Sequence, residues 1–134
     1  MSYDLQSAKD HSHAGYLHLS VEQMCFVRRV LEAAGTLDRD VEWPEISGQF
    51  CNEARSPHPR RIPAFKLTSN EWWIFEAEEC RWLADALENH GQSTQDLVAT
   101  VERQDRELEE PADVLARFAM FCRKCESEDG FVVS

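Results

Sequence analysis

The spacing of apolar residues predicts an amphipathic helix near the N-terminus, over about residues 20–34. Ser20 and Gln23 have the spacing of a capping box, in which each side chain accepts a hydrogen bond from the other residue's backbone N–H. Gly35 follows the helix and can adopt the left-handed conformation that ends many helices. The start and the end of this helix are therefore both marked in the sequence.

The second half of the chain carries three further helical patterns, over about 77–90, 94–109 and 111–125. Gly91 ends the first of them, and Pro111 opens the last because proline suits the first turn of a helix. The last pattern has the widest apolar face, so we expect that helix to be the most buried.

Strand patterns are short. Two apolar runs on either side of Ser69 and Asn70 predict a β-hairpin over about 64–75. Tyr3–Leu5 and Phe131–Val133 predict short terminal strands. Together these elements predict an α+β fold, in which about four helices pack on one face of a small, mostly antiparallel sheet.

The chain is expected to form one domain over residues 1–134, interrupted by a Pro/Arg-rich loop at about 52–63. A hydrophobic content of 43% excludes intrinsic disorder for the whole chain. The longest apolar run, Phe118–Cys122, is too short for a transmembrane span or a signal peptide.

Negative charge is concentrated in the second half of the chain. Residues 1–70 carry 8 basic and 9 acidic side chains, whereas residues 71–134 carry 6 basic and 16 acidic ones. This asymmetry fits either a solvated surface or an acidic face that binds a basic protein partner. The acidic face would consist of Glu102, Asp105, Glu107, Glu109, Glu110 and Asp113. A net charge of −11 argues against direct binding of nucleic acid or of an anionic membrane.

A second, basic site is the alternative. Trp72 and Trp73 are adjacent on a predicted strand and therefore point to opposite faces. One indole belongs to the core, and the other could stack on a ligand. Basic side chains nearby could bind an anion, although they could equally pair with the acidic helices of the same molecule. This alternative site comprises Arg55, His58, Arg60, Arg61, Lys66, Trp72 and Trp73.

The five cysteines and five histidines do not have the spacing of a metal site. Cys122 and Cys125 form a CxxC motif, but both lie on the apolar stripe near the end of a predicted helix, so we expect them to pack in the core. His11, His13 and His18 lack supporting ligands and are expected to be ordinary polar residues. We therefore expect no metal and no cofactor, and reduced thiols in a cytoplasm.

No motif for nucleophilic catalysis or phosphate binding is present. The sequence contains no GxSxG, P-loop or HExxH, and its carboxylates have no spacing that singles out an acid–base pair. We expect a protein without enzymatic activity.

Four segments resemble a group of small bacterial proteins: MSYDL, LEAAGTL, SNEWWIFEAEECRWLADALE and VLARFAMFCR followed by GFVV. The resemblance covers about half of the chain. This sequence departs from the group at Glu76-Ala77, where a Thr-Pro helix start is usual, and in its acidic segment 93–110. The resemblance implies the order of the elements and a bacterial or bacteriophage cytoplasm, and it implies no activity.

These observations favour a small acidic binding protein, such as an inhibitor or immunity-type protein of a bacterial or phage conflict system. A regulatory domain that binds a small ligand or a nucleotide at the basic loop 55–66 is the alternative.

Overall fold

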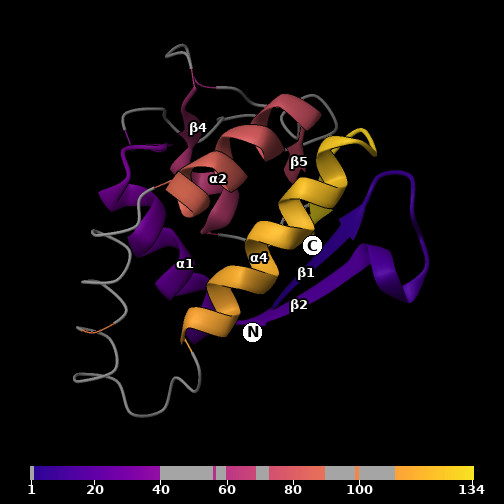
Figure 1. The fold of residues 1–134 in the computed structure, drawn as a ribbon, viewed down its shortest axis with the longest axis horizontal. Coiled ribbons are helices and arrows are strands. Elements are labelled where there is room, and N and C mark those ends of the chain that lie inside the picture. Colours follow the sequence, from indigo (N-terminus) through magenta and orange to yellow (C-terminus); the bar gives the residue numbers. More distant parts are fainter. Residues whose placement is uncertain (1, 40–55, 57–59, 69–72, 90–98, 100–110) are drawn as a thin grey trace.

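The computed structural model describes residues 2–39, 56, 60–68, 73–89, 99 and 111–134. In this part of the chain, a four-stranded antiparallel sheet and three α-helices form an α+β fold (Figure 1). The strands are β1 (Ser2–Ser7), β2 (Tyr16–Ser20), β5 (Trp73–Phe75) and β6 (Phe131–Val133), in the order β2-β1-β6-β5. The helices are α1 (Val21–Ala33), α2 (Ala77–Asn89) and α4 (Pro111–Glu126). The predicted α+β class is confirmed. Of the helix predicted over 94–109, only residue 99 is described, and it is helical; the rest lies outside the described residues.

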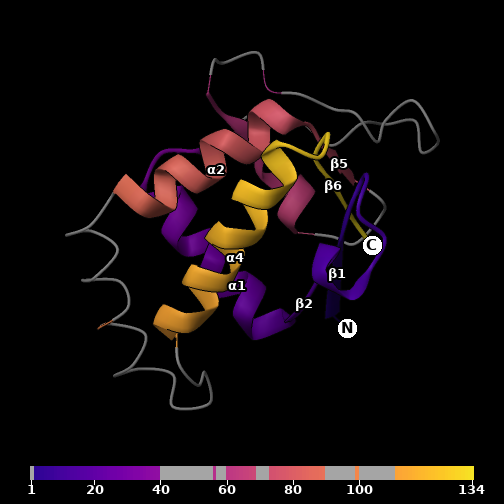
Figure 2. The ribbon, with the colours of Figure 1, turned by 45° about the vertical axis from the view of Figure 1, so that its right-hand side comes forward.

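The sheet has one covered face. Alternate residues of each strand are buried, as expected when helices pack on a single side. One row of buried side chains crosses all four strands in register: Leu17, Leu5, Val133 and Trp73. Figure 2 shows the strands on one side of the molecule and the helices on the other. The core therefore lies between this sheet face and the helices.

Aromatic rings link α4 to the sheet. The rings of Phe75 and Phe131 stack with their centroids 4.6 Å apart, and Phe121 of α4 meets Phe131 edge-on at 5.2 Å. Phe118, one turn earlier in α4, is fully buried. These contacts pack the inner side of α4 into the core.

Both predicted ends of α1 are confirmed. The Ser20 hydroxyl accepts a hydrogen bond from the Gln23 backbone N–H at 3.1 Å, and the Gln23 side chain accepts one from the Ser20 N–H at 2.9 Å. Gly35 follows the helix with φ of +75°, which a residue with a Cβ rarely adopts.

The predicted hairpin over 64–75 is wrong. Ala64–Leu67 forms a single turn of 3₁₀ helix (η3), and β5 pairs with β6 rather than with a neighbouring strand. Phe65, Lys66 and Leu67 are all buried, whereas a strand of a one-sided sheet buries only alternate residues. Burial of all three residues does not fit the alternation seen in this sheet, and the 3₁₀ turn accommodates it.

Two smaller elements complete the described part of the chain. β3 (Leu37–Asp38) and β4 (Ile62–Pro63) form a short parallel pair, so β4 occupies the last two residues of the predicted Pro/Arg-rich loop. His13–Gly15 forms a 3₁₀ turn (η1) between β1 and β2. None of the helices in the described part of the chain has the length and apolar composition that crossing a membrane requires.

Candidate functional site

The structure describes one residue of the predicted acidic face. Asp113 is exposed in the first turn of α4, and its carboxylate accepts a hydrogen bond from the Arg117 guanidinium at 2.9 Å. The other five members lie outside the described residues: Glu102, Asp105, Glu107, Glu109 and Glu110. They immediately precede Pro111 in the sequence, where α4 begins.

Arg123 of α4 is held by three carboxylates. Its guanidinium lies 2.5 Å from Asp85 and 2.8 Å from Glu88 on α2, and 3.0 Å from Glu126 on its own helix. Hydrogen bonds to Glu88, Asp85 and Glu126 raise the pKa of Arg123. The surface between α2 and α4 therefore carries more negative than positive charge at this point.

Lys124 is neutralised in the same way. Its ammonium lies 2.9 Å from both Asp10 and Glu128, and hydrogen bonds to these two carboxylates raise the pKa of the lysine. The remaining basic side chains of these two helices also have carboxylate partners, since Arg81 pairs with Glu78 and Arg117 with Asp113. Every basic side chain of α2 and α4 is thus engaged by a carboxylate of the same chain.

Protein-family models, curated proteins and solved structures give no match to this chain.

The alternative basic site is only partly assembled among the described residues. Arg60 and Arg61 are exposed at the start of β4, and neither has an ion-pair partner in the described part of the chain. Arg60 has φ of +61°, an uncommon backbone conformation for a residue other than glycine. Trp73 is 2% exposed and packs edge-on against Phe65, so it is the core indole of the tryptophan pair. Arg55, His58 and Trp72 lie outside the described residues.

Lys66 does not lie on the surface with Arg60 and Arg61. It is fully buried, and its ammonium contacts both carboxylate oxygens of Glu79 at 3.0 and 3.1 Å. The same ammonium lies 4.8 Å from the centre of the Phe75 ring. Glu79 also accepts a hydrogen bond from the Glu76 backbone N–H at 3.0 Å, so it caps the N-terminus of α2. Lys66 is therefore part of a buried ion pair and is not available to a surface ligand.

Three cysteines are buried where α2, α4 and β1 meet. Cys80, Cys122 and Cys125 are free thiols, and burial raises the pKa of all three, that of Cys125 to about 11. Nowhere among the described residues do three or more His, Cys, Asp or Glu side chains gather in a way that could hold a metal ion. The CxxC cysteines thus pack as small apolar side chains in the core.

These three thiols should react with a thiol reagent only after unfolding, because a protonated buried thiol is a poor nucleophile. We expect Ellman's reagent to modify three of the five cysteines at least about tenfold more slowly in native buffer than in urea.

The purified protein should contain no stoichiometric zinc and should keep its fold in a chelator. One zinc per chain in elemental analysis would contradict this prediction, because structural zinc contributes directly to folding.

His18 belongs to a hydrogen-bonded cluster on the outer face of the sheet. Its Nδ1 lies 2.8 Å from an Asp4 carboxylate oxygen, to which the Tyr16 hydroxyl also donates. The hydrogen bond from Tyr16 and, to a smaller extent, that from His18 lower the pKa of Asp4. The hydrogen bond to Asp4 raises the pKa of Tyr16. His11 and His13 are exposed near the β1–β2 turn. The cluster ties β1 to β2 on the face that the helices leave open.

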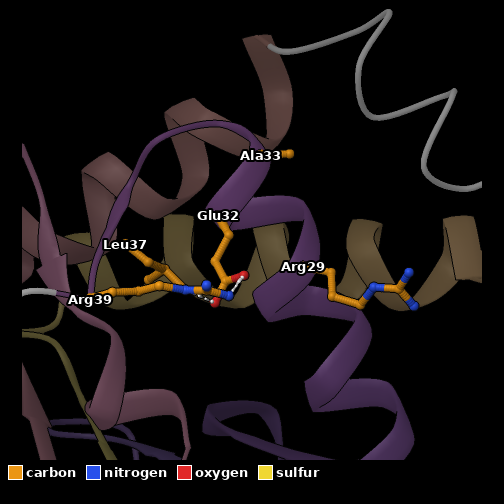
Figure 3. Close-up of a pocket in the computed structure, with 5 residues that line it drawn as sticks. All are labelled: Arg29, Glu32, Ala33, Leu37 and Arg39. Atoms are coloured by element: carbon orange, nitrogen blue, oxygen red, sulfur yellow. Dashed lines mark hydrogen bonds and ion pairs between the residues drawn. The ribbon is translucent and has the colours of Figure 1, made fainter.

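A surface hollow of about 480 Å³ lies beside the C-terminal end of α1. Arg29, Glu32, Ala33, Leu37 and Arg39 line it, and Glu32 binds the Arg39 guanidinium through both carboxylate oxygens. Figure 3 shows the Arg29 side chain extending away from the Glu32–Arg39 pair. Because the two guanidinium groups do not converge, the hollow lacks the geometry of an anion site.

The Lys66–Glu79 pair was not predicted from the sequence. Glu79 has the position of a capping-box glutamate, three residues after Glu76, and this spacing was the available signal. The sequence alone could not show which cation the glutamate meets inside the fold.

Proposed function

We propose that this protein is a small acidic binding protein, without enzymatic activity, which engages a basic surface of a partner protein. The engagement of every basic side chain of α2 and α4 by the chain's own carboxylates carries this proposal. These helices leave no free cation to attract an anionic ligand. The residues 102–110, which precede α4, add five acidic side chains against two arginines. The surplus negative charge is therefore available to a cationic partner.

An inhibitor or immunity-type protein is the concrete form of this proposal. Such a protein blocks a basic surface, for example the nucleic-acid groove of a nuclease, and needs no catalytic residues of its own. The small size and the charge asymmetry support this role in a bacterial or phage conflict system. Free, buried thiols support a reducing cytoplasm as the compartment. Affinity capture from the native host followed by mass spectrometry would identify the partner.

Reversal of charge in the acidic face should slow association with that partner. We expect the triple substitution Glu107→Lys, Glu109→Lys and Glu110→Lys to lower the association rate constant about tenfold or more at low ionic strength. The difference from wild type should shrink at physiological salt, where the Debye length is about 8 Å. Stopped-flow or surface-based kinetics at several salt concentrations would measure both effects.

A matched pair of single reversals separates a local acidic face from net charge alone. Glu107→Lys and Glu22→Lys change the charge by the same amount, and Glu22 is exposed in the first turn of α1. Only Glu107→Lys should slow association substantially. Equal association rates for the two variants, or rates that do not depend on salt, would leave the acidic residues as a solvated surface.

A second candidate function is the binding of an anionic small ligand such as a nucleotide. The exposure of Arg60 and Arg61, without an ion-pair partner in the described part of the chain, favours it. Under this alternative, Arg60→Gln with Arg61→Gln would abolish ligand binding, whereas the glutamate reversals would leave it intact or strengthen it. Calorimetry with nucleotides on both sets of variants distinguishes the two functions.

A further inference from the structure

Met120 is an exposed apolar side chain at the middle of α4. It is 72% exposed, whereas Phe118 and Phe121 on the opposite side of the helix are buried in the core. Among the described residues, Tyr16 is the other large hydrophobic side chain with substantial exposure, at 39%, and its hydroxyl is bound to Asp4. Met120 therefore differs from Tyr16, because in the described part of the chain its side chain has no hydrogen bond and is mostly exposed.

The surface around Met120 has an apolar centre and a negatively charged border. Ala112 and Ala116 are exposed at intervals of four residues before Met120, so the three side chains form one row along the outward face of α4. Three cations flank this row: Arg117, Arg123 and Lys124. Six carboxylates bind these cations: Asp10, Asp85, Glu88, Asp113, Glu126 and Glu128. The border thus has an excess of three negative charges.

We propose that this outward face of α4 docks a basic amphipathic helix of the partner, with Met120 as the apolar anchor. This inference rests on the proposed function and extends the binding surface from the acidic face, which ends at Asp113, along the outward side of α4. The apolar side of such a helix would lie along Ala112, Ala116 and Met120, and its lysine or arginine side chains would meet the surplus carboxylates. Methionine suits this role because its unbranched, polarisable side chain adapts to the partner's shape. A central apolar side chain inside a polar border is the usual arrangement of a binding hot spot.

Methyl NMR of the methionines tests the docking surface directly. The chain has three methionines, of which Met24 is fully buried and serves as an internal reference. The probe is a synthetic amphipathic helix of leucine and lysine, about 18 residues or five turns long. A second peptide of the same composition, scrambled so that it has no apolar face, is the control. We expect the ¹³C-methyl signal of Met120 to shift saturably with the first peptide and not with the second, while the Met24 signal stays in place.

The affinities of two alanine variants for the amphipathic peptide distinguish binding at Met120 from nonspecific binding. Met120→Ala should weaken binding of the amphipathic peptide about tenfold, whereas Tyr16→Ala on the sheet should leave it unchanged. Circular dichroism would verify that both variants keep the fold. If Met120→Ala binds as tightly as wild type, or if both peptides shift the Met120 signal equally, the docking surface is overturned. If the partner protein still associates in a salt-dependent way despite those results, the proposed acidic binding function stands. Failure of the docking surface is therefore distinguishable from failure of the proposed function.

Discussion

Substitution of Lys66 by methionine is expected to lower the free energy of unfolding by about 3–5 kcal/mol, because it leaves the Glu79 carboxylate buried without its cation. A surface lysine in a ligand site would cost far less, within about 0.5 kcal/mol. Denaturant titration followed by circular dichroism measures this free energy. The result therefore distinguishes a buried ion pair from the surface basic residue that the sequence suggested.

The double variant Lys66→Met with Glu79→Gln is the matched control. Glutamine keeps an oxygen for the Glu76 backbone N–H but removes the buried charge. We expect the double variant to recover at least about half of the loss caused by Lys66→Met alone, because no uncompensated charge remains. The single variant Glu79→Gln completes the comparison. If the loss of stability in the double variant equals the sum of the losses in Lys66→Met and Glu79→Gln, the two side chains are not energetically coupled.

Phe118→Ala is expected to destabilise the protein by about 3–5 kcal/mol. Phe118 is fully buried on the inner face of α4, so its removal loses apolar burial and leaves a cavity that the neighbouring side chains fill only partly. Met120→Ala lies two residues away on the exposed face of the same helix and should change stability by less than about 0.5 kcal/mol. If both variants lose the same free energy of unfolding in urea titrations, Phe118 does not lie on the buried side of α4 and Met120 on the exposed side.

The helices were the predictable part of the fold, because their signals are local. Ser20, Gln23 and Gly35 lie within or next to the helix they delimit, so a short stretch of sequence defines both ends of α1. Sheet order has no comparable local signal. β6 lies between β1 and β5, and nothing near Phe131–Val133 in the sequence indicates either neighbour.

The hairpin error and the misplaced Lys66 have the same cause. Two apolar runs on either side of Ser69 and Asn70 led to the hairpin, and Lys66 within the first run was assigned to a surface basic site. The fold instead buries Lys66, because Glu79 arrives from the start of α2 and provides a partner inside the core. A tertiary contact overrode the local pattern, and only the three-dimensional arrangement reveals it.

The candidate site also depends on tertiary contacts that the sequence does not show. Composition located the excess of acidic residues, and Asp113 is exposed where the acidic segment meets α4. The ion pairs that neutralise Arg123 and Lys124 join α4 to α2 and to the β1–β2 turn, so the sequence could not show that these cations are already occupied.

The place of β6 between β1 and β5 has a consequence for how fast the chain folds. The ladder between β1 and β6 pairs Leu5 with Val133, two residues 128 positions apart in the sequence. Closing so long a loop costs chain entropy before any contact between these strands compensates for it. α1 and the pair of α2 and α4 depend on nearer contacts and can form earlier. We therefore expect the joining of β1 to β6 to be the slow step, and the sheet to remain open at its centre until late in folding.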